Sequence, residues 1–204
     1  NIFSLGLLVD DYDSIQTKRK SPNGLANNHL TAKLSLNFRI FFIMSNALLT
    51  ESSLPQFSHI TPECVAPTIE QLLAQNRETI AALAHQPTPT WQSLPAQLEE
   101  LDDTLSKAWS IVSHLNAVTN SPAWREAYNG CLAKISAYYT ELGQNSDLYN
   151  SYQALADSNE FAQLDQAQQQ TINNALRDFK LSGVALPTEQ KQRFAAIEER
   201  LSAI

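Results

Sequence analysis

The four histidines are the first residues to test for chemistry, because two imidazoles one helical turn apart can hold zinc. They are His29, His59, His85 and His114. None of them begins the pattern His-Glu-x-x-His, in which the glutamate activates a zinc-bound water. His114 would lie beside an apolar helix face. There the residues favour a structural bond to a backbone carbonyl, and a substrate contact is the alternative.

Four carboxylates lie close together at Glu99, Glu100, Asp102 and Asp103. A site for a hard cation needs oxygens that converge from a turning loop, which usually contains a glycine. Here the carboxylates would radiate from a helix. The sequence therefore favours a solvated acidic face over a cation site.

The tyrosines Tyr138, Tyr139, Tyr149 and Tyr152 form a third group of candidates. Each offers an apolar ring and a hydroxyl, which would suit the lining of a peptide groove. Packing between helices is the alternative that the sequence favours.

The two cysteines, Cys64 and Cys131, lie on separate apolar helix faces, and neither has a histidine near it in sequence. A disulfide is one possibility, and buried free thiols in a reducing cytosol are the interpretation that we prefer. The sequence also shows no Gly-rich phosphate loop and no serine in a nucleophile elbow. It therefore predicts no catalytic, cofactor-binding or metal-binding residue in this chain.

The charge of the chain argues against nucleic acid as a partner. The 204 residues carry a net charge of −7, and residues 1–43 contribute +2, which leaves −9 for residues 44–204. A domain this acidic repels phosphate backbones. No segment reaches the roughly 20 apolar residues of a membrane span. We therefore expect a cytoplasmic protein with neither nucleic acid nor membrane as a partner.

The character of the sequence changes at Met44, the single methionine. Before it lie glycines and basic clusters, and after it alanine, glutamine, glutamate and leucine recur at helical spacing. We interpret Met44 as the initiator and residues 1–43 as a non-native or upstream-translated leader. We expect this leader to be disordered or poorly packed, and residues 44–204 to form one helical domain.

Apolar residues spaced three and four apart predict six helices after an extended stretch at 44–60. Ser121-Pro122 supplies a helix start, and Gly183 supplies a helix stop. The short connections predict an all-α array of antiparallel hairpins or a bundle. The helices should begin at Thr61-Pro62, Thr90-Trp91, Ser121-Pro122, about Asp147, about Asp165 and Pro187-Thr188.

The last of these helices carries an apolar stripe of Phe194, Ile197, Leu201 and Ile204. No cap, glycine or proline ends it, so we expect a chain that is cut short at its C-terminal end. Side chains that should pack on an absent partner would also expose apolar area, which invites aggregation.

Three stretches in the same order carry a family resemblance. They are LPQFSHITPECVAP, SHLNAVTNSPAWREAY, and NNALRDFKLSGVALP followed by RLSAI. Together they resemble the N-terminal part of oligopeptidase A-like members of the thimet oligopeptidase and neurolysin family of zinc metallopeptidases. The resemblance covers essentially all of residues 44–204.

The resemblance implies a function for the whole enzyme. It implies a zinc-dependent endopeptidase that hydrolyses short peptides, with this segment forming part of the wall of a deep channel. The zinc ligands and catalytic groups would lie in a later, C-terminal part, so this chain would bind no zinc and be inactive alone. The alternative is a free-standing helical module that binds peptides or the full-length enzyme.

Overall fold

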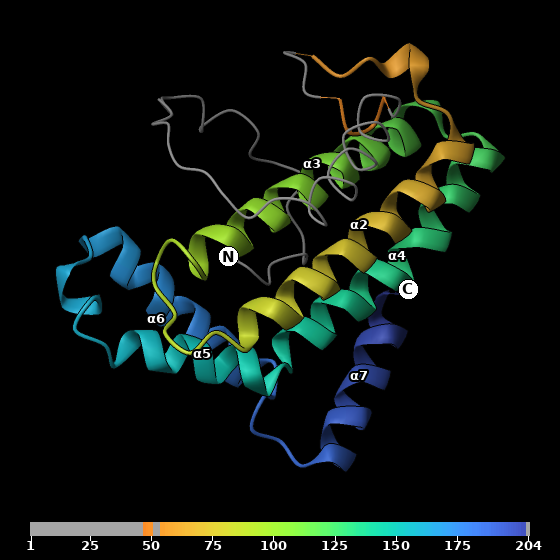
Figure 1. Cartoon of the computed structure of the whole chain (residues 1–204). Coiled ribbons are helices and arrows are strands. Elements are labelled where there is room, and N and C mark those ends of the chain that lie inside the picture. The colour runs from red at the N-terminus through yellow and green to blue at the C-terminus, as the bar shows by residue number, and fades with distance from the viewer. Residues whose placement is uncertain (1–46, 51–53, 203–204) are drawn as a thin grey trace.

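A computed structural model of the chain describes residues 47–50 and 54–202 (Figure 1). These residues form α-helices and short 3-10 turns with no strand, which confirms the predicted all-α class. The expectations for residues 1–43, Met44 and Ile204 lie outside the described residues. The helices are α2 (Pro62–Ala84), α3 (Pro95–Thr119), α4 (Pro122–Gly143), α5 (Ser146–Ala156), α6 (Gln166–Leu181) and α7 (Thr188–Ser202), and the turns are η1 (Phe57–His59) and η2 (Phe161–Gln163).

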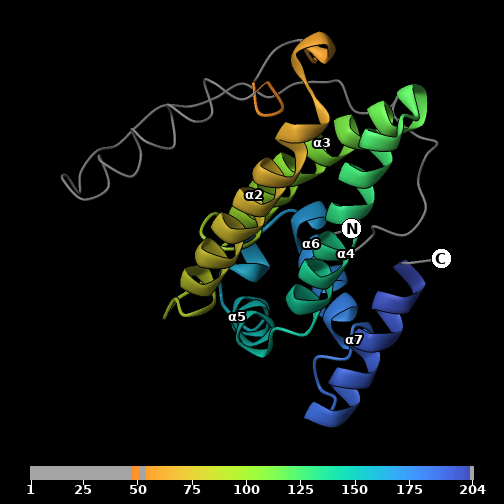
Figure 2. The same cartoon turned by 90° about the vertical axis from the view of Figure 1, so that its right-hand side faces the viewer.

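The long helices α2, α3 and α4 pack side by side, while α5 and α6 lie at one end and α7 runs along α4 (Figures 1 and 2). Consecutive long helices are antiparallel, as predicted. As a result α2 and α4 are parallel neighbours, a pairing that the sequence did not predict. Two ion pairs between these helices, Glu70–Lys134 and Arg77–Glu141, show that they run in the same direction. Both pairs have the same sequence separation of 64 residues, so a step along α2 corresponds to an equal step in the same direction along α4.

The core is centred on one face of α4. Its members Cys131, Ile135, Tyr138 and Leu142 recur at spacings of three and four, and each is at most 7% exposed. They meet apolar faces of α2 and α3, which supply further buried side chains: Val65, Ile69, Leu72, Leu73, Leu98, Leu105, Trp109 and Val112. Burial of this size is the main favourable contribution to folding.

The helix ends follow their capping residues. The Ser121 Oγ accepts a hydrogen bond from the Trp124 backbone N–H at 3.3 Å at the start of α4. After α6, Gly183 has a φ of 82°, and a Cβ there would approach Leu186 Cδ1 to 2.6 Å. Only glycine accepts this conformation without strain, which confirms the predicted stop.

One predicted helix start is wrong: the second helix begins at Pro95 and not at Thr90-Trp91. Pro95 has no N–H, so it cannot continue the hydrogen-bond ladder of the preceding turn. It also restricts Leu94, which has a φ of −124° and a ψ of −75°, outside the helical region. Thr90 and Ser93 instead close a separate turn, in which each backbone N–H donates to the other side-chain oxygen at 3.0–3.1 Å. The other predicted starts agree with the structure to within one residue.

We expect Ser121→Ala to lower the free energy of unfolding by about 1 kcal/mol, because the Trp124 N–H loses its capping partner. Thr61→Ala is the matched control, because the Thr61 side chain makes no capping bond to the backbone at the start of α2 and bonds instead to the exposed Glu63 side chain. Urea unfolding of both variants would measure the difference. Equal losses in the two variants would contradict this role for Ser121.

Candidate functional site

A polar hollow, which we call the acidic hollow, lies between α3 and α6 and has a volume of about 310 Å³. Carboxylates dominate its lining, and no lysine or arginine contributes to it. The lining residues are Glu99, Asp102, Asp103, Ser106, Thr171, Asn174, Ala175 and Asp178.

Asp102 is the least ordinary carboxylate of this hollow. Burial raises its pKa, and the nearby Asp103 and Glu99 raise it further. The Tyr139 hydroxyl opposes these effects by donating a hydrogen bond to Asp102 Oδ1 at 2.8 Å. This contact reaches from α3 to α4, so Asp102 also links two of the long helices.

The predicted solvated acidic face is therefore correct for only part of the run. Glu100 and Asp103 are exposed, and Asp103 forms an ion pair with Lys107 at 2.6 Å. Glu99 and Asp102 are half-buried. Helical spacing alone could not show this, because the covering side chains belong to α4 and α6.

A metal site is not formed by the described part of the chain. Within residues 47–50 and 54–202, no three His, Cys, Asp or Glu side chains lie together so that they could hold a metal ion. These residues do not fit the zinc site that the family resemblance implies.

The three histidines that the structure describes lie on separate elements, and each has its own contact. His59 Nδ1 is 3.0 Å from Gln56 Oε1, and His85 Nδ1 is 2.8 Å from the Ala81 carbonyl oxygen. His114 is exposed and packs on the Phe57 ring, with 5.4 Å between the ring centroids. The predicted carbonyl bond of His114 is wrong for the residues that the structure describes. His29 lies outside these residues.

The tyrosines pack between helices, which agrees with the alternative that the sequence favoured. Tyr138 and Tyr152 are buried, at 4% and 0% exposure, and Tyr139 is half-buried with a raised pKa. Tyr149 is half-buried, and its ring meets Phe179 edge-on at 5.9 Å. The Tyr152 hydroxyl is enclosed without a hydrogen-bond partner among the described residues.

Both cysteines are free thiols, so the disulfide alternative is wrong. Cys131 is fully buried, and burial raises the pKa of its thiol. Cys64 is only half-buried, and its Sγ donates to the Thr61 carbonyl at 3.0 Å. A buried thiol with a raised pKa is a poor nucleophile, which favours a packing role for Cys131.

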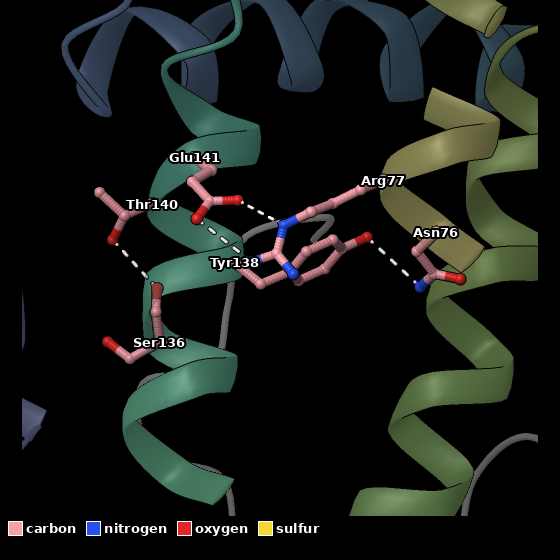
Figure 3. Close-up of polar contacts among 6 residues, drawn as sticks. All are labelled: Asn76, Arg77, Ser136, Tyr138, Thr140 and Glu141. Carbon is pink, nitrogen blue, oxygen red and sulfur yellow. Dashed lines mark hydrogen bonds and ion pairs between the residues drawn. The ribbon is translucent and has the colours of Figure 1, made fainter. Parts of the chain in front are cut away.

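A second polar cluster joins α2 to α4 (Figure 3). Arg77 donates two hydrogen bonds to the Glu141 carboxylate, at 2.7 and 3.1 Å, and its guanidinium lies 5.6 Å from the centre of the Tyr138 ring. Asn76 is 3% exposed and donates from Nδ2 to the Tyr138 hydroxyl at 3.3 Å. We call these four residues the α2–α4 clamp.

Sequence reasoning missed Asn76 and Arg77. A signal for Asn76 was present, because it follows Leu72 and Leu73 on the apolar face of its helix. A polar side chain on such a face needs a buried partner. The partner, Tyr138, is 62 residues away, and only the parallel pairing of α2 and α4 brings the two together.

Comparison with known proteins places these features in a family. The model of the N-terminal domain of neurolysin and thimet oligopeptidase matches residues 69–191. The chain belongs to this family. The matched segment contains the α2–α4 clamp and every residue that lines the acidic hollow.

Individual relatives carry the name Oligopeptidase A. The Haemophilus influenzae protein is 48% identical over 161 residues, and the Escherichia coli protein is 46% identical over 162 residues. Each match covers 79% of this chain and 24% of the relative. A probable cytosolic oligopeptidase A of Arabidopsis thaliana is 30% identical over 162 residues, which are 23% of that protein. The chain thus spans about a quarter of the length of these relatives.

Among the helices that the structure describes, none is both long enough and apolar enough to cross a membrane.

We expect Tyr138→Phe to lower the free energy of unfolding by about 1–3 kcal/mol, because the buried Asn76 amide loses its acceptor while the ring stays in place. Tyr128→Phe is the control. Its half-buried ring stacks on Trp109 at 4.7 Å, and its hydroxyl serves no buried partner among the described residues. Denaturant unfolding should separate the two variants, and a Tyr138→Phe loss no larger than the control would refute the clamp.

We expect Asp102→Asn to raise the free energy of unfolding near pH 7 by about 0.5–1 kcal/mol. The folded-state pKa of Asp102 lies above its ordinary value, so protonation favours the folded state, and this stabilisation is lost as pH rises through that pKa. Near pH 7 the half-buried carboxylate is charged, and an amide removes that cost while its oxygen can still accept from Tyr139.

Thermal unfolding across a pH series tests this, with the exposed Asp103→Asn as the control. The gain from Asp102→Asn should shrink towards zero as pH falls below about 4, where aspartate is protonated in both states. A gain that is the same at acid and neutral pH would rule out the carboxylate charge as its cause.

Proposed function

We propose that this chain is the N-terminal helical part of a zinc-dependent oligopeptidase, a metalloendopeptidase that hydrolyses short peptides. The observation that carries the proposal is the match of residues 69–191 to the family's N-terminal domain, together with 46–48% identity to proteins named Oligopeptidase A. In this proposal the helical domain runs over residues 44–204, residues 1–43 form a leader outside it, and the domain forms part of the wall of the substrate channel.

The chain's own residues would supply architecture rather than reaction chemistry. None of its histidines begins a His-Glu-x-x-His pattern, so the zinc would be held by a part of the enzyme that this chain does not include. The α2–α4 clamp and the Tyr139–Asp102 bond tie three long helices together through directional contacts. Such contacts suit a wall that must keep its shape while peptides pass along it.

We place the protein in the cytoplasm and expect neither nucleic acid nor membrane as a partner. The support is the pair of free thiols and the acidic charge. The names of relatives do not decide the compartment, since one Arabidopsis relative is called cytosolic and another organellar. Fractionation of the native host with an antibody to this chain would test the assignment, and recovery in a membrane or organelle fraction would contradict it.

The purified chain, supplied with zinc and a short unstructured peptide, should cleave no more peptide than a blank without protein. A chimera should be active instead. In it, the matched part of the Haemophilus influenzae Oligopeptidase A is replaced by the 161 matching residues of this chain. We expect the chimera to hydrolyse the same peptide in a zinc-dependent way, because this chain then supplies only the wall. Mass spectrometry of the peptide products measures both reactions.

The full-length Haemophilus protein is the positive control, and the chimera treated with a chelator is the negative control. Zinc-dependent cleavage by the chain alone would overturn the assignment of the catalytic groups to another part. A folded chimera without activity would count against the channel-wall role. If the chain alone bound the peptide without cleaving it and the chimera stayed inactive, the free-standing binding module would replace the enzyme proposal.

A further inference from the structure

Helix α7 is covered on one side only. It runs antiparallel to α4 (Figures 1 and 2), and its start is held by Lys191, whose Nζ donates to the Gln144 carbonyl at 3.2 Å and to Ser146 Oγ at 3.3 Å. None of residues 188–201 is buried. By contrast α5, which has only 11 residues, buries Leu148, Ser151, Tyr152 and Leu155.

Two aliphatic side chains of α7, Ile197 and Leu201, lie outside the covered side of the helix. With 100° per residue, the half-covered residues of α7 centre on one side of the helix, and Ile197 and Leu201 lie about a quarter turn away from that side. Ile197 is 49% exposed and Leu201 is 60% exposed. The half-covered residues are Lys191, Phe194, Ala195 and Glu198.

Helix α4, which packs against α7, carries several small side chains outside its core face. Figure 3 shows Ser136 and Thr140 on the side of α4 that is turned away from α2. Gly130, Ala133 and Ala137 form another line along α4, all three are exposed, and a Cβ on Gly130 would meet only open space. Since Lys191 lies beside Gln144 and the helices are antiparallel, Leu201 is level with about residue 134 of α4. The exposed Ala133 and Ala137 lie close to this level, and their small side chains leave room for another helix.

An isolated helix of about 15 residues is marginal in water, so most of its stability must come from packing. Ile197 and Leu201, two exposed aliphatic side chains at i and i+4, are suited to such packing. The relatives contain chain that could pack on α7, because about three quarters of each relative lies outside the part that matches this chain. The family-model match itself ends inside α7, at residue 191.

We propose, resting on the function proposed above, that the face of α7 formed by Ile197 and Leu201 docks the catalytic remainder of an oligopeptidase A chain. The docked remainder would cover both side chains and fix α7 against α4. The contact at this α7 face would then fix the position of the helical domain relative to the catalytic remainder.

The test compares the same substitutions in two proteins, the full chain and the Haemophilus chimera described above. The variant is Ile197→Gln with Leu201→Gln, which keeps helix-forming residues while removing the aliphatic face. The matched control is Val118→Gln, because Val118 is 64% exposed near the end of α3 and far from α7 in sequence. The measurements are amide hydrogen exchange of α7, thermal unfolding and peptide hydrolysis.

We expect α7 amides to exchange at least about tenfold more slowly in the chimera than in the full chain alone. The double variant should abolish this protection and lower the melting temperature of the chimera, yet leave that of the full chain unchanged. Val118→Gln should change neither protein. This pattern distinguishes a docking face from a merely structural role within the helical domain.

Equal exchange of α7 in the two proteins would overturn the docking proposal, even if the chimera cleaves peptide and the proposed function stands. Protected α7 in a chimera that cleaves nothing would leave the docking face standing and sink the proposed function. A chimera that fails to fold while the Haemophilus protein folds would count against docking. If light scattering showed a dimer of the full chain that the double variant dissolves, a second copy would be the occupant instead.

Discussion

The parallel packing of α4 on α2 is the constraint on which the rest of the described structure depends. One face of α4 must fill the core while its flanks meet α2, α3 and α7, so each side has its own chemistry. The core face is apolar, and the α2 side places Tyr138 and Glu141 against Asn76 and Arg77. Because a buried amide is costly without a partner, the Asn76–Tyr138 bond selects one register between two helices that apolar contacts alone would let slide.

Much of the helical framework could be predicted from the sequence because its signals are local. Ser121 and Gly183 act on backbone groups within a few residues, and their types alone indicate where a helix begins or ends. The start at Pro95 was missed because the preceding turn, closed by Thr90 and Ser93, resembles a helix start in sequence. The choice between the two depends on the φ and ψ values that proline imposes on its predecessor.

The candidate sites were harder to predict than the helices, since their properties depend on contacts between residues that are distant in sequence. Helical spacing placed Asp102 on a wet face, and it could not show that the Tyr139 hydroxyl, 37 residues later, would reach its carboxylate. His114 was expected to bond an adjoining backbone carbonyl and instead packs on Phe57 at the surface. The family could be recognised from the sequence because three characteristic stretches occur in the expected order along the chain. The clamp and the acidic hollow depend on which helices meet, and single-helix periodicity carries no information about that.

The stability of this segment and its proposed role in a peptidase therefore depend on different helices. The core around Ile135 and the clamp are both formed by residues of α2, α3 and α4, so the centre of the domain does not depend on α7. Helix α7 differs, because none of residues 188–201 is buried and its Ile197 and Leu201 side chains are exposed. A domain built in this way can fold around its own core and still expose apolar side chains on one helix, here Ile197 and Leu201 of α7. If that face of α7 receives the catalytic part, as proposed above, alignment of the wall with the reacting groups depends on a helix with no buried residue over 188–201, and loosening α7 would affect catalysis before it affected the core.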